Sequence, residues 1–214
     1  VFGASILETL TTGMYKDPII IYREYIQNAC DAIDQAVREG LYEEQRQGSV
    51  HLFVDRDRRY VAIEDNGAGV LAAKFRRIVG DIANSSKKAN KDKGFRGIGR
   101  LAGLAYCKRL VFTTRAAGES VVSRLECDAV RFCAMVNEKG YTAAEVLDAA
   151  FSFSAEDAKK KDAAHFFRVE LYDVKREADA LLDKDRIRSY LSFVAPAAYE
   201  NSFYQSGLIT GYAV

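Results

Sequence analysis

The first residues whose types and spacing could do chemistry are Glu24, Asn28 and Asp31, which follow one another at intervals of four and three. On an α-helix these intervals bring the three side chains to one face. A carboxylate one turn from a carboxamide can orient a water molecule, while the amide oxygen binds a hard cation such as Mg²⁺. The simpler interpretation is the solvated polar face that amphipathic helices normally carry. The choice between the two depends on the motifs further along the chain.

The helix that must position these side chains is predicted over residues 18–39. Asp17 offers an N-cap side chain, Pro18 suits the first turn, and Gly40 ends the helix. At 100° per residue the apolar positions gather on a stripe that the fold can bury. This stripe consists of Ile21, Tyr25, Ala29, Ile33, Ala36 and Val37.

A second motif, Asp65-x-Gly67-x-Gly69, follows a predicted hairpin of strands over 50–55 and 59–64. An acid at a strand end can accept a hydrogen bond from an exocyclic amine. Two glycines let the backbone come close to a flat ring. Taken alone, the motif is equally typical of an ordinary tight turn.

A third motif, Gly94-x-x-Gly97-x-Gly99, precedes a predicted helix, where free backbone N–H groups favour a phosphate. Residues Gly97 to Ala102 also fit the dinucleotide pattern GxGxxG/A. That pattern should directly follow a buried strand, whereas here the lysine-rich polar segment 80–96 precedes it. Segment 80–96 is either a surface loop or a mobile lid. The P-loop pattern GxxxxGK[ST] does not occur in the sequence.

The rest of the chain alternates predicted helices and strands. These are helices over 5–13, 71–79, 97–106 and 183–193, strands over 109–115, 120–127 and 166–171, and helical and polar segments over 128–162. The segment 128–162 is expected to be an insertion packed on the outside. Without an internal repeat or a clear boundary, residues 1–214 are predicted to form one α+β domain, a sheet covered by helices on one face.

Composition excludes several classes. The 214 residues carry a net charge of +1, which gives no global attraction to nucleic acid or acidic membranes. No apolar run approaches the roughly 20 residues that cross a bilayer, and no signal peptide is evident. Four scattered cysteines and two histidines, His51 and His165, argue against a metal cluster and favour free thiols in the cytoplasm. Both histidines are expected to pack in or beside strands. The chain begins with Val1 rather than Met, so it is expected to be trimmed or part of a longer protein.

Together, in this order and spacing, the three motifs resemble the GHKL ATPases. This family includes the ninety-kilodalton heat-shock chaperones, MutL, type II topoisomerases, MORC proteins and histidine kinases. The resemblance covers roughly residues 5–127 well. It implies the Bergerat fold, a mixed, mostly antiparallel sheet with helices on one face. ATP would lie between the sheet edge and a mobile lid over 80–96.

The resemblance also implies roles for individual residues. Glu24 matches the general base that activates the attacking water, Asn28 the magnesium ligand, and Asp65 the acid that binds the adenine amino group. Arg23 matches a basic residue common before the base. Asp31 matches the acid beside the adenine pocket, and Gly67 and Gly69 match the glycines that shape it. The lid contacts correspond to Ser85, Ser86, Lys87 and Lys88. The glycine box around the phosphates corresponds to Gly94, Phe95, Arg96, Gly97, Ile98 and Gly99.

Two departures from the family pattern stand out. Where the family often has a Gly-Thr pair that helps to hold the adenine acid, this chain has Phe166-Phe167. Several members also complete their active site with a lysine from a following domain, which this chain does not contain.

The resemblance implies the N-terminal ATP-binding domain of a longer protein, nearest the chaperone, MutL and MORC branch, and the predicted function is Mg²⁺-dependent ATP binding and hydrolysis. In that branch nucleotide binding closes the lid and is coupled to dimerisation, so a homodimer is expected for the full-length protein and no membrane contact is expected. Glu24 and the missing phosphoacceptor histidine segment argue against a histidine kinase. The alternative is a nucleotide-gated interaction module without significant catalysis. The sequence does not identify a client protein, and it leaves a role for DNA open.

Overall fold

The computed structural model describes residues 17–44, 47–75, 77, 99–138, 140–158 and 164–194. The helix predicted over 5–13, the segment 80–96, and Gly97 and Ile98 lie outside these residues. The described elements include six strands: β1 (Val50–Asp55), β2 (Tyr60–Asp65), β3 (Arg109–Arg115), β4 (Val121–Asp128), β5 (Phe151–Asp157) and β6 (Phe166–Tyr172). The helices are α2 (Ile20–Arg38), α3 (Ala72–Phe75), α5 (Ala129–Asn137), α6 (Ala143–Ala150) and α7 (Lys184–Val194), with 3₁₀ helices η2 (Gly99–Ala105) and η3 (Arg176–Leu182).

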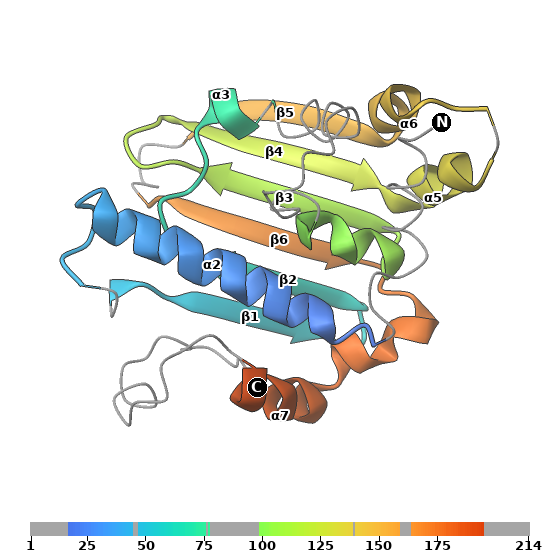
Figure 1. Cartoon of the computed structure of the whole chain (residues 1–214), viewed down its shortest axis with the longest axis horizontal. Helices are drawn as coiled ribbons and strands as arrows, with labels where there is room; N and C mark the ends of the chain where they lie inside the picture. The colour runs from blue at the N-terminus through green and yellow to red at the C-terminus, as the bar shows by residue number, and fades with distance from the viewer. Residues whose placement is uncertain are drawn as a thin grey trace, which may run out of the picture.

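The six strands form one sheet in the order β1-β2-β6-β3-β4-β5 (Figure 1). Every neighbouring pair is antiparallel, so this part of the sheet is antiparallel throughout rather than mixed. The late strand β6 lies between the two hairpins, β1–β2 and β3–β4, and joins them. The predicted α+β class is confirmed, and helix α2 crosses one face of the sheet (Figure 1).

Helix α2 forms largely as its periodicity predicts. Its buried residues are Ile21, Tyr22, Tyr25, Ile26, Ala29, Ile33 and Ala36, whereas Val37 is only partly buried. The helix start differs from the prediction. Ile19 occupies the N-cap position without a side-chain cap, because Pro18 and Ile19 belong to a preceding turn. The Asp17 carboxylate still accepts a hydrogen bond from the Ile19 N–H at 3.2 Å.

The segment predicted as an insertion over 128–162 contains two helices and a strand. Helix α6 begins with a capping box, in which Thr142 and Glu145 satisfy each other's backbone N–H groups. Residues Phe151–Asp157 then form β5, the edge strand beside β4. The alternation Phe-Ser-Phe-Ser at its start is the period-two signal of a strand. This part of the segment therefore extends the sheet.

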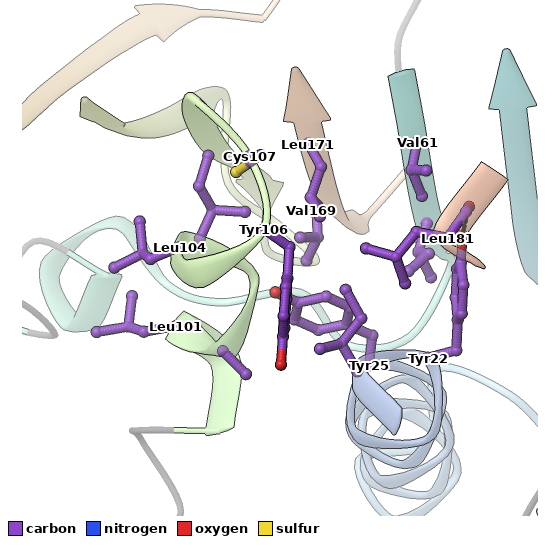
Figure 2. Packing of buried hydrophobic residues seen from close by; sticks show 14 of the residues in the cluster. Tyr22, Tyr25, Val61, Leu101, Leu104, Tyr106, Cys107, Val169, Leu171 and Leu181 are labelled. Atoms are coloured by element: carbon purple, nitrogen blue, oxygen red, sulfur yellow. Dashed lines mark hydrogen bonds between the residues drawn. The ribbon is translucent and has the colours of Figure 1, made fainter. Parts of the chain in front are cut away.

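The core lies between the sheet and α2, and it continues under η2 and α7. Figure 2 shows Tyr22 and Tyr25 projecting from α2, with Leu101 and Leu104 of η2 on the Tyr25 side and Leu181 on the Tyr22 side. Both tyrosine side chains are almost fully buried. The helix is thus held against the sheet by two large side chains one turn apart. None of the helices in the described ranges is long and apolar enough to cross a membrane.

Candidate functional site

A small pocket lies between α2 and the sheet at the end of β2. Its walls are contributed by α2, β2, β6 and the loop after β2, through Tyr25, Asn28, Ala32, Ile63, Asp65, Gly69, Val70, Phe167 and Val169. Most of these side chains are apolar, and Asp65 is the acid among them. The pocket encloses about 30 Å³, which is room for about two water molecules. A larger ligand enters only if a wall moves.

Asp65 sits at the end of β2, where the sequence predicts an acid facing the pocket. The residue is 4% exposed. One carboxylate oxygen accepts the backbone N–H of Gly67 at 2.9 Å. Hydrogen bonds offset the cost of burying a carboxylate, and a ligand in this pocket could donate one more to Asp65.

Each of the two glycines in this motif is required for a different structural reason. A Cβ at Gly67 would lie 2.6 Å from the backbone carbon of Ala32, and the next residue, Ala68, donates its N–H to the Ala32 carbonyl at 3.0 Å. Gly69 has φ +67°, and a Cβ there would lie 2.1 Å from the Arg115 carbonyl oxygen. The glycines therefore let the loop dock against α2 and the β3–β4 hairpin. Gly69 also lines the pocket.

Side chains that sequence reasoning did not assign to the site fix the Asp65 loop. The Asn66 amide oxygen accepts the Ser49 N–H at 2.6 Å, and the Tyr42 hydroxyl donates to the Asn66 carbonyl at 2.6 Å. His165 Nδ1 donates to the Gly67 carbonyl oxygen at 2.6 Å. His165 thus has a structural role beside a strand, as predicted, although 98 residues separate it from Gly67. An Asn-Gly pair is a local turn signal, whereas nothing local indicates the histidine contact.

The polar residues of α2 do not all reach the pocket. Asn28 lines it, and Glu24 lies one turn earlier, half-buried. Asp31 is exposed and accepts a hydrogen bond from the Gln27 side chain at 3.1 Å, outside the pocket lining. Arg23 is exposed. The structure therefore brings Asn28 and Asp65 to one pocket, places Glu24 on the adjacent turn, and leaves Asp31 and Arg23 on the outer surface.

The register of β6 explains the departure at Phe166-Phe167. Phe167 pairs with Asp65 of β2 on one side and with Thr114 of β3 on the other. The fully buried Thr114 hydroxyl accepts the Val70 N–H at 3.0 Å and donates to the Phe166 carbonyl at 2.8 Å. The phenylalanine therefore occupies the place beside the acid, and the buried threonine lies one strand further on, holding the loop at Val70.

Gly99 begins η2, and the other glycine-box and lid residues lie outside the described part of the chain. These are Ser85, Ser86, Lys87, Lys88, Gly94, Phe95, Arg96, Gly97 and Ile98.

The cysteines are free thiols, as predicted. Cys30 on α2 is half-buried, and burial, with Asp34, Asp31 and Asp65 nearby, raises its pKa to about 11. Burial also raises the pKa of Cys107 to about 12. Thiols with such pKa values stay protonated and unreactive near neutral pH. Among the described residues, no group of three or more His, Cys, Asp or Glu side chains could hold a metal ion.

Comparison with known proteins gives a family and several relatives. The family described as histidine kinase-, DNA gyrase B-, and HSP90-like ATPase matches residues 20–158, a span that holds α2, the Asp65 loop and the glycine box. Chaperone protein HtpG of Psychrobacter arcticus is 27% identical over 203 residues, covering 86% of this chain and 28% of that protein. HtpG of Psychrobacter cryohalolentis is 31% identical over 133 residues, which are 54% of this chain and 20% of that protein.

HtpG of Chromobacterium violaceum is 30% identical over 138 residues, 56% of this chain and 22% of that protein. The chain thus spans less than a third of the length of these relatives.

Proposed function

Because the chain belongs to the histidine kinase-, DNA gyrase B- and HSP90-like ATPase family, we propose that the pocket beside α2 binds the adenine of ATP. The observation that carries this proposal is the buried Asp65 carboxylate among apolar walls. Once a wall moves to enlarge it, an apolar pocket with one buried acid can hold a flat apolar ring and select it through that polar group. The adenine amino group would donate a hydrogen bond to Asp65, while the Gly67 N–H keeps the carboxylate oriented.

We further propose that the domain hydrolyses ATP with Mg²⁺. Asn28 would supply an oxygen ligand from the pocket wall, and Glu24, one turn away, would orient and deprotonate the attacking water. The cation would neutralise charge on the phosphates. A carboxamide fits this role because Mg²⁺ takes oxygen ligands and keeps several of its waters.

The phosphates would be bound by the glycine box and the segment before it. The residues that we assign to this role are Ser86, Lys87, Gly94, Phe95, Arg96, Gly97, Ile98 and Gly99. Asp31 is exposed and outside the pocket lining, so we do not assign it a ligand contact. Nucleotide binding would close the segment 80–96 over the site and promote dimerisation of the longer protein.

A second candidate is a nucleotide-gated interaction module that binds ATP as a switch without significant turnover. It is favoured by the position of the proposed base, Glu24, which is half-buried and lies outside the pocket lining. A switch requires only that ATP bind two conformations with different affinities.

The experiment that tests ATP binding is calorimetric titration of ATP and Mg²⁺ into wild type, Asp65→Asn and Asp55→Asn. Asparagine at 65 keeps an oxygen for the Gly67 N–H but loses the negative charge offered to the adenine amine. Asp55 is a matched control, because it also ends a strand and accepts a backbone N–H, from Arg58, at the opposite end of the β1–β2 hairpin.

We expect Asp65→Asn to weaken ATP binding about 10- to 100-fold, with Asp55→Asn unchanged. Equal affinities for all three proteins, or no binding to folded wild type, would contradict the proposed adenine site.

A further inference from the structure

Tyr25 links the wall of the pocket to the helix that follows the glycine box. It lies on α2, one residue after Glu24, and is 2% exposed. Its ring lines the pocket that contains Asp65. Its hydroxyl oxygen accepts the backbone N–H of Gly103 in η2 at 3.1 Å. One side chain thus touches both the proposed base site and η2.

The Tyr25 hydroxyl lies so close to Gly103 that η2 has little room to move relative to α2 at this point. A Cβ at this position would lie 2.5 Å from the Tyr25 hydroxyl oxygen and 3.1 Å from a methyl group of Leu110. The end of η2 is held separately, since the Lys175 ammonium donates to the Ala105 carbonyl at 2.8 Å. Tyr25 therefore fixes the middle of η2 against α2, four residues after Gly99, where η2 begins.

We propose that Tyr25 is a positioning residue that sets the distance between the base pocket and the start of η2 at Gly99, the last glycine of the box. This inference rests on the proposed ATP site. ATP contacts both regions at once, so its affinity depends on their separation, whereas adenosine occupies the base pocket alone. Loss of the Tyr25 hydroxyl should therefore weaken ATP binding more than adenosine binding. The substitution Tyr25→Phe removes this hydroxyl and keeps the six-membered ring of a residue that lines the pocket.

Tyr22 provides a matched control on the same helix. It is fully buried, and its hydroxyl donates to the Leu181 carbonyl at 2.5 Å, away from the pocket lining. Figure 2 shows the two tyrosines directed to different neighbours, Tyr22 to Leu181 and Tyr25 toward η2. Tyr22→Phe removes the same chemical group from a buried hydrogen bond to the backbone, in which the hydroxyl donates instead of accepting. Any general effect of losing a buried hydroxyl on α2 therefore appears in both variants.

The test compares the dissociation constants of ATP–Mg²⁺ and adenosine for wild type, Tyr25→Phe and Tyr22→Phe. Amide hydrogen exchange at Gly103 is followed in parallel without nucleotide. We expect Tyr25→Phe to weaken ATP about fivefold more than adenosine and to speed exchange at Gly103. Tyr22→Phe should change neither the ratio of the two affinities nor the exchange at Gly103.

The outcomes separate the two proposals. If wild type binds ATP and Tyr25→Phe leaves the ratio of ATP to adenosine affinity unchanged, the positioning role is wrong and the ATP site stands. The same conclusion follows if Tyr22→Phe shifts the ratio equally. If folded wild type binds neither ligand, the proposed function is wrong and the positioning role with it.

Discussion

Phe167 lies directly opposite Asp65 across the antiparallel pair β2–β6, and both side chains line the same pocket. Opposed residues on one face of a sheet have Cβ atoms about 5 Å apart. The aromatic ring also contacts Phe75 and Phe112, with ring centroids 6.3 and 6.1 Å away. The acid therefore has an apolar neighbour at the position where a polar residue could assist it, and this neighbour occupies part of the pocket.

Shortening Phe167 should open the pocket to the adenine ring. We expect Phe167→Thr to raise ATP affinity about threefold or more, because the ring no longer has to move, and to lower the free energy of unfolding by about 2 kcal/mol. Phe166→Thr is the control, since alternate strand residues face opposite sides of the sheet. Calorimetric titration and urea denaturation measure both effects. Weaker ATP binding by Phe167→Thr would show instead that the phenyl ring contacts the base.

Replacing Glu24 should separate binding from catalysis. General-base catalysis contributes about 10²- to 10⁴-fold to a rate, so we expect Glu24→Gln to reduce phosphate release by at least about 100-fold. ATP affinity should stay within about twofold of wild type, because Glu24 is outside the pocket lining. Steady-state phosphate release and calorimetry on the same samples give the two values. Unchanged turnover would remove Glu24 from the mechanism, and ATP binding without any wild-type turnover would favour the switch.

Local patterns were sufficient for much of this architecture. The apolar periodicity of α2 predicts its buried face because helix geometry is regular, and the acid at the end of β2 can be found because a strand leads directly into it. Both hairpins and β6 also follow from runs of strand-forming residues. The Phe-Ser-Phe-Ser alternation before residue 155 is a strand signal that indicates β5. The prediction of helical and polar segments over 128–162 overlooks this signal, because the residues that precede it are typical of a helix.

Long-range pairing accounts for what the sequence could not provide. The position of Phe167 beside Asp65 depends on the register of two strands about 100 residues apart in the chain. The hydrogen bond from His165 to Gly67 depends on the same pairing. The spacing of Asp31 suggested a shared face with Asn28, yet a modest rotation around the helix leaves Asp31 exposed. Registers and small rotations are set by the packing of the whole core.

The close approach of the Asp65 loop to α2 predicts a specific cost for a methyl group at Gly67. Gly67→Ala would place a Cβ 2.6 Å from the Ala32 backbone, so we expect a loss of about 2–3 kcal/mol in the free energy of unfolding. ATP binding should also weaken, since Asp65 accepts the Gly67 N–H. Gly118→Ala is the control. Its φ of +79° costs a side chain about 1–2 kcal/mol, but no atom lies within 4 Å of the added group.

Urea denaturation and ATP titration of the Gly67→Ala and Gly118→Ala proteins check this prediction. Equal stability losses with intact ATP binding in both would mean that the loop can move away from α2 without affecting the site.

The buried thiol of Cys107 predicts a loss of stability at alkaline pH. The side chain is fully buried, its Sγ–H donates to the Gly103 carbonyl, and burial raises its pKa from 9.0 to about 12. The folded state therefore keeps the proton while the unfolded thiol ionises. This contribution to stability is complete below about pH 9 and is lost as the pH rises toward about 12, at about 1.4 kcal/mol per pH unit.

We expect the free energy of unfolding to fall less steeply in this range for Cys107→Ala than for wild type, although the variant is less stable at neutral pH because of the cavity. Urea denaturation at a series of pH values measures both slopes. Parallel slopes for the two proteins would show that the Cys107 thiol can ionise in the folded state, and therefore that water reaches the junction of η2 and β3.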